Sequence, residues 1–254
     1  MAGNSKKTFA AFVAARERYR EELGALERKV PGLGKLQQEL VDRRSGPAYP
    51  VETPVVYNRA LDDVGPADRI RLILVADNPG RREQAAENRR YLVGPSGKIA
   101  EAFFRNNPEL GIDFHRNVVI LNKTPVHTPR TADLAELCRL DPEIAGLVEA
   151  SQRIMAALLL EFHRALAPAP VWISGCSQMR RGGIFAAYTE SLARIYSEKA
   201  NAALRESLFL YRHFSMNQFT IHLRQETRPG EKTEETLLRI GRAYRERILG
   251  KYVF

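Results

Sequence analysis

Residues 72–104 read LILVADNPGRREQAAENRRYLVGPSGKIAEAFF, and this stretch decides the fold. An apolar run stops at Asp77-Asn78-Pro79-Gly80, and a second glycine-rich turn, GPSGK at 94–98, comes before another apolar pattern. A short apolar run bounded by turn residues is typical of a buried strand, and apolar residues at helical spacing are typical of a helix. The stretch therefore predicts a strand, a polar loop and a helix, in that order.

Three further segments have the same short apolar character as this first strand. The four predicted strands lie at residues 70–76, 117–121, 171–174 and 207–211. The predicted helices that separate or follow them lie at residues 96–106, 142–166, 183–204 and 231–250. Alternating strands and helices predict an α/β fold: a three-layer α/β/α arrangement around a mainly parallel, four-stranded sheet.

The first 50 residues have a different pattern. A helix is predicted at 5–29, where apolar residues recur at helical spacing, and Pro31-Gly32 ends it. A second short helix at 34–44 precedes the proline-rich connector SGPAYPVETPVV. We therefore expect an N-terminal helical extension and connector at 1–50 and the main domain at 51–254.

The charge balance favours an anionic partner. The 254 residues include 39 Lys and Arg against 30 Asp and Glu, a net charge of +9. Such a surplus favours nucleic acid before a membrane surface, although a merely soluble basic protein explains the charge equally well. No apolar window reaches the roughly 18 residues of a membrane span, and the N-terminus lacks the apolar core of a secretory signal. We therefore expect a cytoplasmic protein without a membrane partner.

Cysteine and histidine usage does not predict a metal site. The two cysteines, Cys138 and Cys176, cannot supply a disulfide framework or the four ligands of a zinc or iron–sulfur site. The five histidines show no close pair at metal-binding spacing. His163 lies in an apolar helical pattern and is interpreted as structural.

Polar turns follow all four predicted strands. They are Asp77-Asn78-Pro79-Gly80, Asn122-Lys123-Thr124-Pro125, Gly175-Cys176-Ser177 and His213-Phe214-Ser215. Ligands of such sheets bind beyond the carboxyl ends of the strands. The order of the segments therefore predicts one site at this edge of the sheet.

Two other interpretations of these turns are weaker. A phosphate-binding P-loop at GPSGK would need glycine in place of Leu92 and Ser or Thr in place of Ile99. What remains is Ser96 as the cap of a helix whose first N–H groups can face a phosphate. A Cys176–His213–Asp77 hydrolase is the second interpretation, but no nucleophile-elbow pattern surrounds the cysteine.

Taken in order, the motifs resemble the uracil-DNA glycosylase superfamily over about residues 68–225. ADNPG is similar to the Gly-x-Asn-Pro-Gly motif of its mismatch-specific and single-strand-selective branches. RRYLVGPSGKIAEAFF and VVILNKTPVHTPR are similar to the PFVGxxGxLL and TNxVKCRPP segments of the thermophile-type, iron–sulfur branch. WISGCSQM corresponds to a strand that usually ends Leu-Gly-x-x-Ala, and YRHFSMNQ to the closing His-Pro-Ser motif.

The resemblance implies an enzyme that extrudes a nucleotide from DNA and hydrolyses the N-glycosidic bond of uracil or a related deaminated base. Asn78 or Asp77 would handle the attacking water, and His213 would donate a hydrogen bond to the departing base. Asn122 would read the edge of the base. Leu92 stands at the position of the family's base-stacking phenylalanine, with Tyr91 next to it.

The resemblance also implies the surfaces that contact DNA. The main chain at Pro79 and Gly80 would approach the base. In the predicted loop HFSMNQFTIHLRQ, Met216 or Phe219 would serve as an apolar wedge, with Arg224 on a phosphate. The other expected DNA contacts are Ser96, Gly97, Lys98, Lys123, Arg130 and Ser215, with Arg81, Arg82, Arg89 and Arg90 beside them.

Departures from the family leave an alternative open. The four cluster-binding cysteines are absent, so the resemblance implies a member without cofactor or a divergent member with an altered substrate. Ala76 replaces the first glycine of the first motif, Leu92 the stacking phenylalanine, and Phe214 the proline after the histidine. The alternative is a non-catalytic nucleic-acid-binding protein that keeps the fold.

Overall fold

The computed structural model describes residues 2–44 and 46–252, with side chains from residue 7 onward, and has a parallel sheet at its centre. The strands are β1 (Leu72–Ala76), β2 (Val118–Asn122), β3 (Val171–Ile173) and β4 (Leu208–Leu210). They are ordered β2-β1-β3-β4, and every neighbouring pair is parallel. The predicted α/β fold with a four-stranded sheet is confirmed, and the ends of each strand lie within two residues of the ends of its predicted segment.

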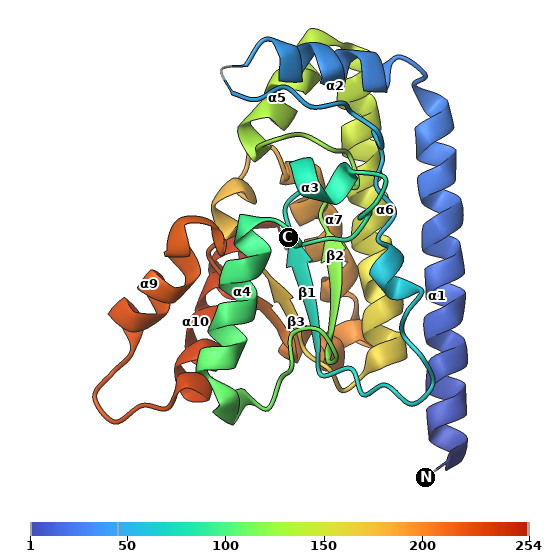
Figure 1. Cartoon of the computed structure of the whole chain (residues 1–254). Coiled ribbons are helices and arrows are strands. Elements are labelled where there is room, and N and C mark those ends of the chain that lie inside the picture. Colours follow the sequence, from blue (N-terminus) through green and yellow to red (C-terminus); the bar gives the residue numbers. More distant parts are fainter. Residues whose placement is uncertain (1, 45, 253–254) are drawn as a thin grey trace.

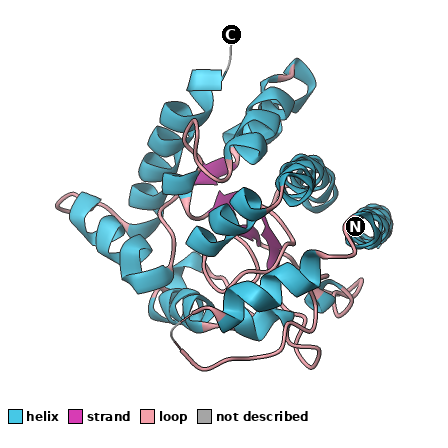
Figure 2. Ribbon diagram, turned by 90° about the horizontal axis from the view of Figure 1, so that it is seen from above, coloured by secondary structure: helices cyan, strands magenta, loops and turns pink. Residues whose placement is uncertain are grey.

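Helices cover both faces of the sheet (Figures 1 and 2). The helix α4 (Pro95–Asn106) covers one face, and its Phe104 stacks on Trp172 of β3 at 5.7 Å between ring centroids. On the other side lie α6 (Pro142–Leu166) and α7 (Ala186–Ser197). All five residues of β1 are buried, because the central strand is covered on both faces. A strand with two covered faces reads as a continuous apolar run, which made it recognisable in the sequence.

The N-terminal helices share the core of the main domain. The long helix α1 (Ala2–Lys29) runs beside α6, where its Phe12 and Tyr19 pack on Phe162 at 5.7 and 6.2 Å between ring centroids (Figure 1). Apolar residues of α1 and of α2 (Leu33–Asp42) belong to the same buried cluster as the strands. The predicted helical extension is therefore present and is packed against the domain, while the boundary at residue 50 stays a prediction.

The remaining elements include the helix predicted at 231–250 and others that local prediction missed. They are α3 (Arg81–Gln84), α5 (Thr131–Leu140), α8 (Ala202–Glu206), α9 (Gln218–Glu226) and α10 (Thr233–Leu249). The 3₁₀ turns are Arg59–Leu61, Pro108–Leu110, Cys176–Gln178, Lys199–Asn201, Ser215–Asn217 and Gly250–Tyr252. The single helix expected at 183–204 is broken, because Asn201 Nδ2 turns back to bond the Ile195 carbonyl at 2.8 Å. Among the described residues no helix combines the length and apolarity needed to cross a membrane.

The prediction of a loop at 213–225 is wrong. It contains a 3₁₀ turn and then α9, whose Phe219 inserts between aromatic side chains of other elements. The Phe219 ring lies 4.3 Å from Phe214 and 4.9 Å from Phe103 of α4. This packing stabilises a nine-residue helix that is too short to be stable alone.

Candidate active site

A cavity of about 720 Å³ opens at the carboxyl ends of the strands. Asp77 and Asn78 after β1, Thr128 after β2, Ser177 after β3 and His213 after β4 all line it. The helix α4 follows β1 on one face of the sheet, and the helix α7 follows β3 on the other face. The two connections run in opposite directions away from the adjacent strands β1 and β3. Such a reversal leaves a crevice for ligands at the strand ends.

Asp77 is fixed at the floor of this cavity by Lys123. Lys123 Nζ donates hydrogen bonds of 2.5 Å to Asp77 Oδ1 and to the Ser174 carbonyl, and the lysine is wholly buried. Gly175 makes room for the pair: it has φ +80°, and a Cβ there would lie 2.2 Å from Asp77 Oδ1. Lys123 therefore neutralises the carboxylate, and the expectation that its ammonium contacts a DNA phosphate is wrong because no part of it is exposed.

The orientation of the Asn78 amide follows from its partners. Its Nδ2 donates to Thr128 Oγ1 at 2.9 Å and to the Thr128 carbonyl at 3.2 Å. The Oδ1 atom therefore points the other way, with the Thr131 hydroxyl 3.3 Å from it and also 3.3 Å from Asp77 Oδ2. Two acceptor oxygens thus face one hydroxyl hydrogen, which leaves capacity to accept from a water molecule.

His213 presents a proton on Nε2. The Ser215 amide N–H donates to His213 Nδ1 at 3.0 Å, and the Ser215 hydroxyl lies 2.8 Å from the same atom. Nδ1 must therefore carry the lone pair, and the neutral ring is protonated on Nε2. Burial lowers the pKa of His213, with a smaller raising effect from Asp77 and a lowering one from Lys123. Within the described chain Nε2 has no hydrogen-bond partner, so it is a neutral donor beside the cavity.

Two buried titratable residues hold the turn at Pro79 and Gly80, and the sequence analysis assigned neither to the site. His127 Nδ1 lies 2.9 Å from the Pro79 carbonyl, and its Nε2 lies 3.1 Å from the Tyr49 hydroxyl. Burial lowers the pKa of His127 to about 4, so the ring is neutral and Nδ1–H donates. Glu83 Oε2 accepts from the Gly80 N–H at 2.9 Å. Its place three residues after Gly80 was the available signal.

Glu83 also lines the cavity, and its carboxyl group is a weaker acid than usual. Burial raises its pKa to about 7, against the lowering effect of the Gly80 and Leu92 amides. The side chain therefore ties the first turn of the site to the segment that carries Leu92.

Of the two expected base-stacking side chains, one lines the cavity and one does not. Leu92 lines it, in a left-handed conformation with φ 54°. Gly97 of α4 packs directly below, since a Cβ there would lie 1.4 Å from the Leu92 carbonyl oxygen. Tyr91 faces α1: its hydroxyl donates to the Val56 carbonyl at 2.6 Å and lies 2.7 Å from the Tyr19 hydroxyl. The expectation that Tyr91 stacks on a base is therefore corrected.

Asn122 is an unpaired polar group in the interior. Its side chain is 1% exposed, and neither Oδ1 nor Nδ2 has a hydrogen-bond partner among the described residues. Asn122 does not itself line the cavity, but its register partner Ala76 does, and register partners point to the same face of the sheet. Leaving a buried amide unpaired costs about 1–3 kcal/mol, so native proteins seldom do so without a ligand or water.

Of the two residues expected to act as the wedge, one is exposed and the other is buried. Met216 is 78% exposed at the rim of the cavity, and it and Asn217 are both left-handed, with φ 51° and 56°. Strained backbone of this kind is common at functional sites. Phe219 is 3% exposed inside the aromatic cluster described above, so it cannot enter DNA. The assignment of Phe219 as a wedge is therefore wrong, and Met216 is the accessible candidate.

The other expected DNA contacts fall into three groups. Ser96, Arg130 and Ser215 line the cavity, together with Arg81 and Arg82. Lys98 and Arg224 are exposed but lie outside the lining. Gly97 is buried, and its role is the packing contact with Leu92. Ser96 is not the helix cap: α4 begins at Pro95, with Gly94 as its N-cap.

Cys176 lacks the features of a nucleophile. It is buried, it does not line this cavity, and burial raises the pKa of its thiol to about 11. Since the thiolate is the reactive form, the thiol is inert at neutral pH. The described part of the chain also contains no group of three or more His, Cys, Asp or Glu that could hold a metal ion.

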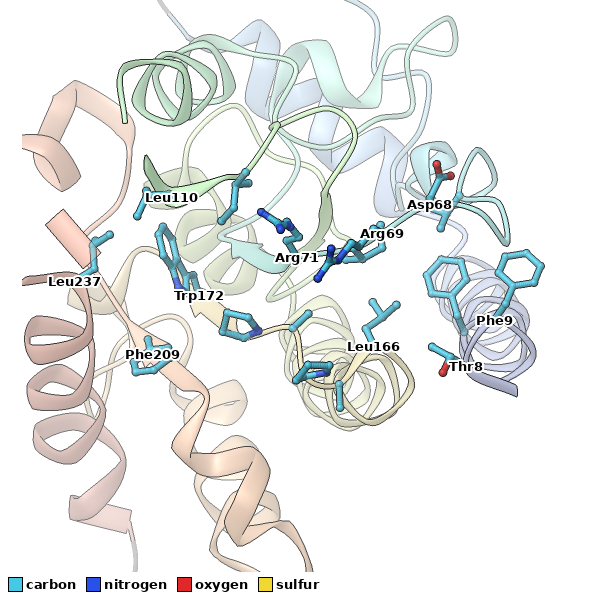
Figure 3. Close-up of a pocket in the computed structure, with 18 of the residues that line it drawn as sticks. Thr8, Phe9, Asp68, Arg69, Arg71, Leu110, Leu166, Trp172, Phe209 and Leu237 are labelled. Carbon is cyan, nitrogen blue, oxygen red and sulfur yellow. The ribbon is translucent and has the colours of Figure 1, made fainter. Parts of the chain in front are cut away.

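A second, mainly apolar cavity of about 580 Å³ lies at the opposite end of the sheet (Figure 3). Trp172, Phe209 and Leu237 line it, with Arg69 and Arg71 pointing into it. These arginines precede β1, so the cavity lies at the amino ends of the strands. It contains none of the residues predicted for the site.

Comparisons with known proteins give no match for this chain: no family model matches it, and no curated protein does.

Proposed function

We propose that this chain is a DNA glycosylase that hydrolyses the N-glycosidic bond of a flipped uracil or a related deaminated base. The observation that carries the proposal is the unpaired amide of Asn122, buried at the same strand edge as the neutral Nε2–H donor of His213. An amide can donate to one atom and accept from the next, as the O4 and N3–H edge of uracil requires. A flipped base would thus complete the hydrogen bonds that the protein alone leaves unmade.

The chemistry divides between the two sides of the base. As the bond from C1′ to the base nitrogen breaks, its electron pair moves onto the base, and negative charge grows on O2. His213 Nε2–H donates to that oxygen without giving up its proton, which is electrostatic stabilisation by a preorganised neutral donor. The base finally takes up a proton from solvent.

Asn78 and Asp77 act on the sugar side. Asn78 Oδ1 accepts from the attacking water, whose oxygen bonds to C1′ while its second proton passes to solvent. Asp77 is paired with Lys123 at 2.5 Å, which makes it a poor base. Its carboxylate instead stabilises the positive charge that develops on the sugar ring. Asn78 rather than Asp77 is therefore the water-binding residue in our proposal.

Leu92 is the specific observation that favours the alternative, a non-catalytic nucleic-acid-binding protein. A leucine at the cavity wall contacts a base but offers no aromatic face for stacking, so less binding free energy is available for base flipping. A non-catalytic binder would keep its affinity for DNA and excise nothing.

A labelled oligonucleotide with one uracil tests the proposal, as a single strand and opposite guanine or adenine. After incubation, alkali cleaves each abasic site. We expect cleavage by the wild type. The rate should be at least about 100-fold lower for His213→Ala, since the loss of one such donor typically costs that much. His115→Ala is the matched control, because this histidine is exposed in the turn before β2. No cleavage of any uracil substrate by the wild type would refute the excision of uracil.

A further inference from the structure

A third cavity, of about 770 Å³, adjoins the candidate active site. The two cavities share Ser177, His213, Ser215 and Met216 as lining residues, so Met216 stands between them. Its charged lining residues are all basic: Arg180, Arg181, Arg212, Arg247 and Lys251. We call these five residues and the space between them the basic cleft. None of these five cations was expected from the sequence to contact DNA; the expected arginines Arg81, Arg82 and Arg130 line the candidate active site instead.

Among the described residues, the positive charges of the basic cleft have no carboxylate partner: none of its five cations is within 4.0 Å of one. Arg247 of the cleft belongs to α10, and other arginines of this helix do have partners: Arg239 pairs with Glu231 at 2.7 Å and Arg245 with Glu246 at 2.9 Å. The cleft is therefore a local concentration of uncompensated charge, and like charges at close range repel unless an anion binds.

Neutral aromatic groups position two of the cations. Arg212 Nε donates to the Tyr244 hydroxyl at 3.3 Å, and the Arg247 guanidinium lies 4.1 Å from the centroid of the Tyr244 ring. Tyr244 therefore orients both side chains without cancelling their charge. Preorganised guanidinium groups suit phosphate, whose oxygens accept paired N–H bonds.

We infer that the basic cleft binds the phosphodiester backbone of the strand on one side of the nucleotide held in the candidate site. The identity of the strand as DNA rests on the proposed function. The geometry supports this path, because a strand leaving the cavity beside His213 passes Met216 and enters the cleft. With Arg81, Arg82 and Arg130 on the other side, cations flank the target nucleotide in both directions.

The test leaves Arg212 and Arg247, which contact Tyr244, in place and neutralises the other three cations in the variant Arg180→Gln/Arg181→Gln/Lys251→Gln. The control variant Lys7→Gln/Arg116→Gln/Lys199→Gln changes the charge equally, at exposed sites near the amino ends of α1, β2 and β4. Affinity for a uracil-free single-stranded oligonucleotide is measured by fluorescence anisotropy between 50 and 200 mM salt. The logarithm of the binding constant falls as log salt rises, and each phosphate contact contributes about 0.7 to the steepness of that fall. Losing three contacts should therefore make the slope shallower by about 2.

We also expect roughly ten-fold weaker binding at 0.1 M salt, with the control variant equal to wild type. The charge-preserving Arg180→Lys/Arg181→Lys variant should retain the wild-type slope, which separates lost charge from damaged folding. Equal slopes for the cleft and control variants would overturn the inference. So would a wild type that does not bind DNA.

Uracil excision by the same proteins distinguishes the two proposals. A decreased slope without excision by the wild type would support the basic cleft and refute the glycosylase. Excision with an unchanged slope would refute the cleft and leave the glycosylase standing.

Discussion

At the scale of single residues, Asn122 connects stability with function. Its unpaired amide disfavours folding, so Asn122→Leu, which is similar in size but apolar, should raise the free energy of unfolding by about 1 kcal/mol. The same change removes the proposed base-reading group and should lower excision of uracil at least 100-fold. Urea denaturation and the alkali-cleavage assay measure the two effects. A destabilised variant that still excises uracil would contradict our assignment of Asn122.

Lys123 has a structural role that its charge in the sequence did not reveal. Lys123→Met leaves Asp77 with a buried, uncompensated carboxylate, and removing one partner of such a pair costs about 3–5 kcal/mol. The double variant Lys123→Met/Asp77→Asn should recover much of that loss in urea denaturation. Arg116→Met, at an exposed position, is the control for a lost surface charge and should stay near the wild-type stability. Equal losses for Lys123→Met and the double variant would show that the ion pair is not the cause.

At the scale of elements, the contact between α4 and the Leu92 segment depends on Gly97. Gly97→Ala would place a Cβ 1.4 Å from the Leu92 carbonyl, so α4 or the cavity wall must move. We expect a loss of about 1–3 kcal/mol in thermal or urea unfolding. Gly146→Ala in α6 is the matched control, since nothing lies within 4 Å of its Cβ position. It should stabilise the protein by up to about 1 kcal/mol, because alanine favours helix.

At the scale of the whole molecule, buried histidines make stability dependent on pH. Burial lowers the pKa of His127 and of His163 to about 4, below the usual 6.5, so the unfolded state binds these protons first. Their contribution is present above pH 6.5 and is lost as the pH falls toward 4. Glu83 acts in the opposite direction: its pKa of about 7 adds stability at low pH that is lost as the pH rises through 7.

Two histidines outweigh one glutamate, so we expect the free energy of unfolding to fall between pH 6.5 and 4.5. The fall should be steeper in Glu83→Gln, because this variant lacks the opposing contribution, which amounts to about 1.4 kcal/mol per pH unit for each proton. Urea denaturation at intervals of half a pH unit measures both slopes. Parallel curves for wild type and Glu83→Gln would show that Glu83 does not titrate in this range.

The sequence determined the strands of the sheet and the turns that end them. An apolar run such as residues 72–76 is a local signal, and chain order alone places the ends of parallel strands at one edge. His213 and Asn78 could therefore be named as site residues before any geometry was known. The helix α9 could not, because its polar turn residues favour a loop and only packing of Phe219 on Phe103 makes it a helix.

Only the tertiary structure decided which side chains at that edge face the cavity. Lys123 and Asp77 are separated by 46 positions, and Tyr91 and Tyr19 by 72, so no local pattern shows that these pairs meet. The basic cleft likewise joins residues after β3 and β4 to the end of α10. Residue types and strand order follow from short-range patterns of hydrophobicity, but burial and charge pairing depend on contacts that form only when distant segments pack together.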